Sequence, residues 1–361
     1  MPIPLFDPAT PVRAIEERVR AAVDAVLADG AYVLGPHVEG FERAFARYVG
    51  ARHAVGVANG TEAITIALRA LGVGPGDDVV VPSFTFYASA EAIPPTGARP
   101  VFCDVDPETS VITPEAVRAA LTPATKAVVA VHLFGNVAPV AEIEALGLPV
   151  VEDAAQAAGS RAAGGARTGA LGTLATFSFY PSKNLGAFGD GGAITTSDAG
   201  LAETVRTLRF HGSPDGSTYE LVGYNSRLDA LQAAILHAQL PELDSWCETR
   251  RAAGRRYAQR LQGVVGLPRP TAGSAPAWGL YVVRDPAPDA LAAALAAEGI
   301  GARGYYRTPV HRQPALAGLA PPAVLPGTEE AARTHLAIPM GAALGEDEVD
   351  AVAAAIRAAR G

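Results

Sequence analysis

The sequence predicts an α/β protein: a large domain with a mostly parallel sheet flanked by helices, followed by a small α+β C-terminal domain. In roughly the first two hundred residues, short apolar runs alternate with helical segments, and this order requires crossover connections between parallel strands. Further along, alanine-rich helices mix with a strand and with loops rich in proline and glycine. A length of 361 residues with 49% apolar content suits one large and one smaller domain. We therefore expect domains over residues 1–240 and 241–361.

The strands expected in the large domain are short apolar runs, several of them rich in valine. They cover residues 55–58, 78–82, 100–102, 127–131, 149–152, 173–179 and 193–196. The expected helices cover residues 61–71, 88–93, 114–121, 140–146, 201–208 and 228–240. Thr113 and Pro114 mark the start of the third helix, because threonine is a favoured N-cap and proline suits the first helical position.

The expected small domain begins with a long helix over residues 246–261, whose arginine-rich polar face suits a helix that joins two domains. Residues 264–276 are rich in proline and glycine and predict a loop. A strand at 279–283 and helices at 288–298 and 345–360 complete this domain.

Composition excludes several classes of protein. A net charge of -8 argues against wrapping of nucleic acid. Apolar runs are too short to span a membrane, and the N-terminus lacks the pattern of a signal peptide, so we expect a cytoplasmic protein without a membrane partner. Cys103 and Cys247 lie far apart, which excludes a disulfide scaffold and disfavours a metal site.

Only two of the 29 basic residues are lysines, Lys126 and Lys183. A lysine can lose its proton and attack a carbonyl, whereas an arginine stays protonated. An equally simple explanation is a coding bias that left two solvated lysines by chance. Lys183 follows the expected strand at 173–179, while Lys126 lies at the start of another strand, and ligands of open α/β sheets gather at the carboxyl ends of strands. Lys183 is therefore the candidate Schiff-base nucleophile.

Two further segments follow expected strands. In residues 59–62, the free N–H groups of a first helical turn and the Thr61 hydroxyl could hold a phosphate, although an ordinary cap and turn fits the local pattern better. Asp153 ends a buried strand, where an ionised carboxylate needs a cation or hydrogen-bond donors. A pyridinium nitrogen would be such a partner, and Gln156 could donate to an adjacent phenolate oxygen. An N-cap role for Asp153 is almost as good an interpretation.

Three more observations leave alternatives open. Ser178 lies in the same segment as Lys183, and Gly189, Gly191 and Gly192 suit a tight turn into the next strand. Phe86 could stack on an aromatic cofactor, although an aromatic residue in such a place more often belongs to the core. The polar cluster at 223–229 could be a capped loop with a surface arginine.

Taken in order, these segments resemble the DegT-like sugar aminotransferases, and the resemblance covers nearly the whole chain. It rests on residues 35–42 (GPHVEGFE), 59–61 (NGT), 82–86 (PSFTF), 152–156 (EDAAQ), 177–186 (FSFYPSKNLG), 223–229 (GYNSRLD) and 306–314 with Tyr306 and His311. Members of this family are fold-type I enzymes that use pyridoxal 5'-phosphate (PLP). The resemblance thus implies a mostly parallel seven-stranded-type sheet and PLP as cofactor.

The resemblance also implies roles for individual residues. Lys183 would link to PLP and later move the proton between the substrate carbon and the cofactor, and Asp153 would keep the pyridine nitrogen protonated. The remaining cofactor contacts would come from Gly60, Thr61 and Ser178 at the phosphate, Phe86 on the ring, Gln156 at the 3′ oxygen, and Asn225 at the phosphate of a neighbouring subunit. A homodimer with shared active sites follows.

The implied reaction transfers an amino group from L-glutamate to a keto group of a nucleotide-linked deoxysugar. The sequence of residues 179–187 and 225–229 is similar to that of the family branch that aminates C3 of dTDP-3-keto-6-deoxyhexoses. Amination at C4 of a dTDP- or UDP-4-keto-6-deoxyhexose, a PLP-dependent sugar dehydratase and a non-catalytic regulatory protein are the alternatives. The dehydratases typically replace the lysine with histidine, so Lys183 speaks against them.

Two departures from the family pattern concern the substrate. Residues 276–281 (PAWGLY) lack the histidines that are common in the family, and Arg307 stands where a proline is frequent. Tyr306, Arg307 and His311 are the candidate substrate contacts, and a solvated surface arginine is an equally good interpretation of Arg307.

Overall fold

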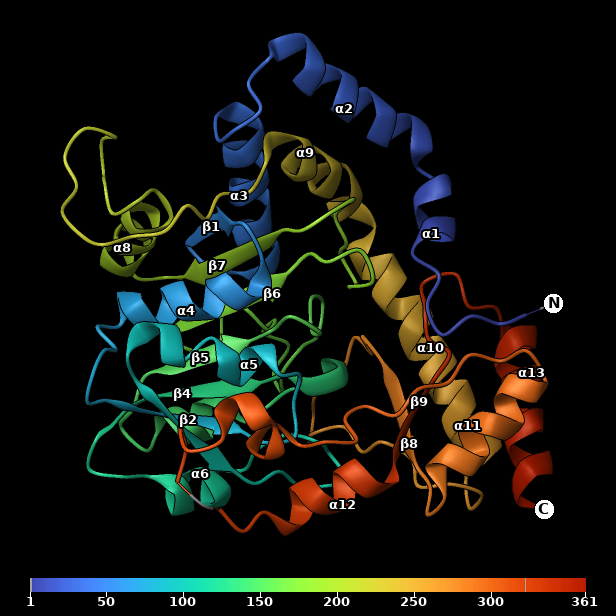
Figure 1. Ribbon diagram of the computed structural model, residues 1–361. Coiled ribbons are helices and arrows are strands. Elements are labelled where there is room, and N and C mark those ends of the chain that lie inside the picture. Colours follow the sequence, from blue (N-terminus) through green and yellow to red (C-terminus); the bar gives the residue numbers. More distant parts are fainter. Residues whose placement is uncertain (1, 322) are drawn as a thin grey trace.

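A seven-stranded sheet forms the centre of the larger part of the molecule (Figure 1). The computed structural model describes residues 2–321 and 323–361. The strands are β1 (His53–Val57), β2 (Asp78–Pro82), β3 (Arg99–Cys103), β4 (Thr125–Val131), β5 (Val150–Asp153), β6 (Leu174–Ser178) and β7 (Gly192–Thr196), in the order β1-β7-β6-β5-β4-β2-β3. β7 is antiparallel to its neighbours β1 and β6, and the other neighbouring pairs are parallel. The predicted mostly parallel sheet is confirmed.

The central strands are buried and rich in valine because helices cover both faces of the sheet. All residues of β2 and β5 are buried. The helices around the sheet are α4 (Gly60–Ala70), α5 (Ala88–Glu91), α6 (Pro114–Ala120), α7 (Val140–Glu144), α8 (Ala199–Arg209) and α9 (Ala230–Gln239), with short 3₁₀ turns at Pro94–Thr96, Leu133–Gly135 and Leu240–Glu242. Thr113 caps α6 as predicted, since its hydroxyl oxygen accepts from the Ala116 N–H at 3.2 Å.

The N-terminal segment forms three helices that the sequence analysis does not assign: α1 (Ala9–Arg13), α2 (Glu16–Asp29) and α3 (Pro36–Val49). α2 and α3 both pack on α9 (Figure 1). Phe41 and Phe45 of α3 meet Phe179 and Phe177 edge-on, with ring centroids 5.4 and 4.9 Å apart. These contacts close the core beside β6.

The smaller part contains a two-stranded antiparallel sheet of β8 (Tyr281–Arg284) and β9 (His335–Ile338). Its helices are α10 (Leu243–Leu261), α11 (Pro288–Ala297), α12 (Pro326–Thr334) and α13 (Glu346–Arg360), with 3₁₀ turns at Val310–Arg312 and Pro314–Leu316. Three of the helices were predicted, while α12 and β9 were not. The strand expected from residue 279 begins only at Tyr281. Gly279 lies against the large part, where a Cβ would come within 2.5 Å of the Gln156 carbonyl oxygen.

The N-terminal segment lies on the smaller part, on the side of the molecule where α13 lies (Figure 1). The Ile3 N–H donates to the Gly299 carbonyl at 3.0 Å, and its carbonyl accepts from the Gly301 N–H at 2.8 Å. The Ile3 side chain is buried in the same apolar cluster as Tyr257 and Leu295. The first residues of the expected large domain therefore pack against the expected small one, and the boundary at 240 and 241 stays a prediction.

A buried ion pair joins α3, β1 and α8. The Arg209 guanidinium donates to Glu42 and to the Gly56 carbonyl oxygen, while Glu42 also accepts from the Gly56 N–H at 2.7 Å. Each side chain of the pair is only 10% exposed. Because Glu42→Ala leaves the arginine charge buried and unpaired, we expect it to lower the free energy of unfolding by about 3–5 kcal/mol. Urea titration followed by circular dichroism measures the loss.

The control for this prediction is Arg43→Ala, which breaks an exposed pair with Glu39 one helical turn away. That variant should change the free energy of unfolding by about 0.5 kcal/mol or less. A Glu42→Ala protein as stable as the Arg43→Ala protein would contradict the role given to the buried pair.

Candidate active site

A cavity of about 330 Å³ opens where the carboxyl ends of β4, β5 and β6 meet the N-terminus of α4. We call it the strand-end cavity. Eight of the residues predicted for the site line it: Gly60, Thr61, Phe86, Asp153, Gln156, Ser178, Lys183 and Tyr306. They come from distant parts of the sequence. All except Tyr306 follow or end strands of the large sheet, which brings them together because its strands end at one edge.

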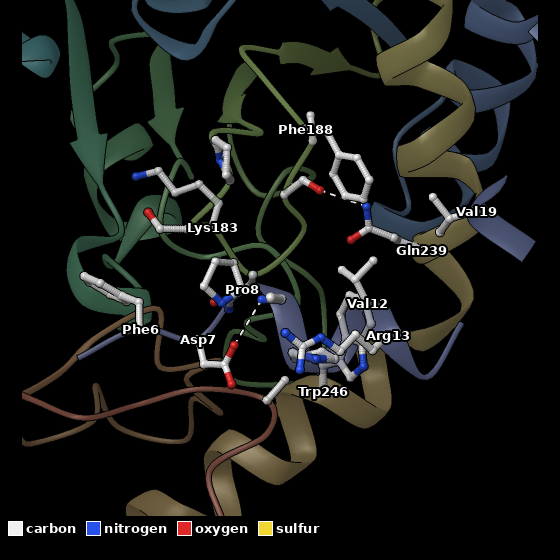
Figure 2. A pocket seen from close by; sticks show the side chains of 18 of the residues that line it. Phe6, Asp7, Pro8, Val12, Arg13, Val19, Lys183, Phe188, Gln239 and Trp246 are labelled. Atoms are coloured by element: carbon white, nitrogen blue, oxygen red, sulfur yellow. Dashed lines mark hydrogen bonds between the residues drawn. The ribbon is translucent and has the colours of Figure 1, made fainter. Parts of the chain in front are cut away.

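A larger groove of about 730 Å³ adjoins this cavity and runs between α1, α2 and α10. Phe6, Ser182, Lys183 and Asn184 line both spaces. In the groove, the Lys183 side chain points away from Trp246 and Gln239 (Figure 2). The lysine amine is therefore available to the strand-end cavity rather than to the groove.

Lys183 lies on the turn that follows β6. Its N–H donates to the Tyr180 carbonyl at 2.8 Å, and Gly186 is needed in this turn because a Cβ would lie 2.6 Å from the Pro181 carbonyl oxygen. Desolvation lowers the pKa of the Lys183 ammonium, and the Asp153 carboxylate opposes this shift. The surroundings thus favour the neutral amine more than water does, as a nucleophile or proton acceptor requires.

Asp153 is the last residue of β5 and is 6% exposed. Its Oδ2 accepts from the Ser89 hydroxyl at 2.7 Å, and its Oδ1 accepts from the Ala155 N–H at 3.1 Å. Residues 154–173 form turns and bends rather than a helix, so Asp153 does not cap the helix that one interpretation of the sequence expects. Its carboxylate instead faces the cavity beside Lys183.

The N-terminus of α4 forms another wall. The Asn59 side chain caps the helix by accepting from the Glu62 N–H at 2.9 Å, and the first-turn N–H groups of Gly60 and Thr61 have no acceptor within a helix. A Cβ at Gly60 would lie 2.7 Å from the Cβ of Ser178. This turn is therefore a capped helix start, and it also lies close against the end of β6 at Ser178. Its N–H groups and the Thr61 and Ser178 hydroxyls are donors suited to an anion.

The smaller part of the molecule contributes Tyr306. Its hydroxyl oxygen accepts from Gln156 Nε2 at 3.1 Å, and Gln156 Oε1 accepts from the Phe134 N–H at 2.7 Å. Burial raises the pKa of Tyr306, so the phenol is neutral at physiological pH. Phe86 lies 6.1 Å from the Tyr306 ring and is 55% exposed, which excludes the interpretation that Phe86 is a core residue.

Three of the predicted residues lie elsewhere. Asn225 is exposed and pairs through its backbone with Phe210, outside the described lining of this cavity. The Arg307 guanidinium donates to the Asp289 carboxylate and to two backbone carbonyls of the smaller part. His311 hydrogen-bonds to Ser83 and lies 3.3 Å from a Glu329 carboxylate oxygen. The structure does not bring Arg307 and His311 to the cavity, because these polar contacts hold both side chains away from it.

Sequence reasoning also missed residues that do line the cavity, among them Phe6, Thr85, Ser89 and Tyr305. Thr85 and Ser89 follow β2, so the rule that selected Asp153 and Lys183 could have selected them. Phe6 carries no such signal, because it reaches the cavity only through the pairing of Ile3 with the smaller part.

Within residues 2–321 and 323–361, no helix is both long and apolar enough to cross a membrane. The same residues contain no group of three or more His, Cys, Asp or Glu side chains that could hold a metal ion.

Comparisons with known proteins give this arrangement a context. The profile of the DegT/DnrJ/EryC1/StrS aminotransferase family matches residues 13–357. A dTDP-3-amino-3,4,6-trideoxy-alpha-D-glucose transaminase of Streptomyces venezuelae is 45% identical over 366 residues, which cover 98% of this chain and 95% of that protein. A protein of Geobacillus stearothermophilus named pleiotropic regulatory protein is 43% identical over 357 residues, 96% of each chain.

Solved structures agree with these matches. The crystal structure of S. venezuelae DesV in complex with a ketimine intermediate superposes with a TM-score of 0.96 at 44% identity, covering 99% of this chain and 98% of that one. Bacillus subtilis NtdA with bound cofactor PMP superposes with a TM-score of 0.86 at 28% identity, covering 96% of this chain and 82% of that one. These similarities confirm the predicted fold class.

Proposed function

Because this chain belongs to the DegT/DnrJ/EryC1/StrS aminotransferase family and is an aminotransferase, we propose that it moves an amino group from L-glutamate to C3 of a dTDP-3-keto-6-deoxyhexose. The observation that carries the proposal is the placement of Lys183 and Asp153 in one cavity at the strand ends. A relative 45% identical is a transaminase whose name places the amino group at C3 of a dTDP-sugar, which supports C3 over C4.

We propose PLP as the cofactor, and the residues of the strand-end cavity suit it. Lys183 offers an amine with a lowered pKa, Asp153 offers a buried carboxylate, and the N-terminus of α4 with Ser178 offers donors to a phosphate. When bound, PLP supplies a carbonyl that condenses with amines and a ring that draws electrons from the carbon being deprotonated. Gly60, Thr61 and Ser178 would hold its phosphate and Phe86 would cover its ring.

Each protein group then has a defined task. The neutral amine of Lys183 would move a proton from the donor's Cα to the cofactor carbon in the first half-reaction, and from that cofactor carbon to C3 of the acceptor in the second, so one base would serve both half-reactions. The Asp153 carboxylate, held by two donors, would keep a proton on the ring nitrogen of PLP. Gln156, whose amide is fixed by Phe134 and Tyr306, would lie at the 3′ oxygen. Glutamate leaves as 2-oxoglutarate before the keto-sugar enters, which predicts ping-pong kinetics.

A screen of dTDP- and UDP-linked 3-keto and 4-keto sugars with L-glutamate tests this function. The position of the new amino group is read by NMR of the product, and we expect it at C3. Amination only at C4 would overturn the choice of substrate. A protein that binds PLP and releases no 2-oxoglutarate with any of these sugars would instead support the regulatory alternative, to which the name of the Geobacillus relative belongs.

We also propose that the active unit is a homodimer with shared sites. Asn225 lies outside the cavity of its own chain, and exposed apolar side chains accompany it on the same surface loop, among them Tyr219, Leu221 and Val222. Mixing an Asn225→Ala subunit with a Lys183→Ala subunit should produce one intact site in each mixed dimer and restore activity. A fully active monomer in sedimentation would contradict sharing.

Gly60→Ala is expected to raise the Kd for PLP by roughly tenfold or more, the effect of losing one hydrogen bond to a charged group. The new Cβ would lie 2.7 Å from the Ser178 Cβ and displace a residue assigned to the phosphate. Equilibrium dialysis of the apoenzyme with PLP measures the change. Gly74→Ala is the matched control, because a Cβ there meets nothing within 4 Å. Equal Kd values for both variants would contradict the phosphate assignment.

A further inference from the structure

A chain of two buried hydroxyl groups ends at the Asp153 carboxylate. Ser89 Oγ lies 2.7 Å from Asp153 Oδ2, and Thr85 Oγ1 lies 3.0 Å from Ser89 Oγ. Each of the two hydroxyl residues is 1% exposed. An ionised carboxylate only accepts hydrogen bonds, so Ser89 must donate to Asp153. Ser89 is then left as an acceptor, and Thr85 donates to it, which fixes the direction of the chain from Thr85 through Ser89 to Asp153.

The two ends of the Asp153 carboxylate are held from different elements. Oδ1 accepts from the Ala155 N–H, which belongs to the turn after β5 itself, whereas Oδ2 accepts from Ser89 in the first turn of α5, after β2. The two donors together determine the plane in which the carboxylate lies. A buried carboxylate needs such donors to remain ionised, and a hydroxyl at 2.7 Å is a strong one.

We propose that Ser89, oriented by Thr85, is a positioning residue of the aminotransferase: it holds the Asp153 carboxylate in the orientation in which that carboxylate would meet the ring nitrogen of PLP. This inference rests on the proposed function, because it assigns Ser89 a task only through Asp153. Ser89 and Thr85 line the strand-end cavity but act on the cofactor through the carboxylate.

Loss of the Ser89 hydroxyl has a definite chemical consequence. Oδ2 loses its donor and Thr85 loses its acceptor, so the carboxylate becomes a better proton acceptor. The proton shared with the ring nitrogen then moves toward Asp153, and the ring becomes less cationic. Both the affinity for PLP and the protonation of its ring nitrogen should therefore change. If Ser89 had a purely structural role, its loss would not change the protonation of the ring nitrogen.

The test measures two quantities on each variant: the Kd of the apoenzyme for PLP by equilibrium dialysis, and the 15N resonance of PLP labelled at its ring nitrogen. For Ser89→Ala we expect Kd to rise roughly tenfold or more and the resonance to move toward that of the neutral ring. Thr85→Val should raise Kd about two- to fivefold, since it removes the second link only. Thr85→Ser keeps the hydroxyl and should restore both values.

Thr65→Val is the matched control for removing a buried hydroxyl. Thr65 lies on α4 and donates to the Ala92 carbonyl at 2.9 Å, away from Asp153, so both readings should stay at the wild-type values. If Thr65→Val moved them as far as Ser89→Ala, loss of packing would explain the effect and the inference would be wrong.

Asp153→Ala separates the two levels of the proposal. If Ser89→Ala kept the wild-type Kd for PLP and the wild-type 15N resonance while Asp153→Ala bound PLP more weakly, the positioning role of Ser89 would be wrong. The proposed function would not be affected by that result. Wild-type readings for Asp153→Ala itself overturn the role of this carboxylate, and the positioning role with it.

Discussion

Lys183→Ala is expected to abolish transamination, lowering kcat by roughly 10⁴-fold or more, since it removes both the amine that links to PLP and the base that moves the proton. We expect this variant to keep its fold, which circular dichroism of the purified protein checks. Release of 2-oxoglutarate from glutamate in the presence of a keto-sugar measures the loss.

Lys126→Ala is the control that the sequence itself offers, because Lys126 is the other lysine of the chain and is exposed at the start of β4. Its kcat should equal that of the wild type. Borohydride treatment of the PLP-loaded protein should fix the cofactor on Lys183 alone. Turnover of glutamate and a keto-sugar by Lys183→Ala, or labelling of Lys126, would refute the assignment.

Asp153→Asn should lower kcat by about 10²- to 10³-fold, the size of effect seen when one preorganised electrostatic partner of a reacting group is removed. The amide is nearly isosteric with the carboxylate, yet it carries no charge to keep the ring nitrogen protonated. Steady-state kinetics with saturating PLP separate this loss from weaker cofactor binding.

Asp24→Asn serves as its control, since Asp24 is an exposed aspartate on the wall of the neighbouring groove. We expect that variant to keep its kcat within about twofold, in line with the small effects of surface charges. An Asp153→Asn enzyme that matched it would show that the cavity carboxylate takes no part in the reaction.

The sheet was predictable because its central strands are buried on both faces and so appear as short runs of valine between helical segments. α1 and α2 were not, since α1 has no buried residue and α2 buries only Val19 and Val26, which leaves a weak apolar period. β9 was not predicted for a different reason. It is only four residues long and depends on pairing with β8, a contact that no local sequence pattern predicts.

Some residues of the candidate site could likewise be predicted from the sequence, and others could not. Asp153 ends β5 and Lys183 follows β6, so their placement at one edge of a parallel sheet could be derived from the order of strands alone. Tyr306 was found through a family resemblance, and its contact with Gln156 depends on how the smaller part packs against the sheet. Arg307 and His311 belong to the same segment as Tyr306, but their side chains hydrogen-bond to Asp289 and Ser83 instead. The direction in which these side chains point depends on packing, which the order of residues alone does not predict.

The hydrogen bond between Gln156 and Tyr306 has a consequence for biosynthesis of the protein. A ribosome delivers all the strands of the large sheet, together with Lys183 and Asp153, well before it reaches Tyr306. The nascent chain therefore gains the Tyr306 wall of the strand-end cavity only near the end of translation, after all the strands of the large sheet have been synthesised.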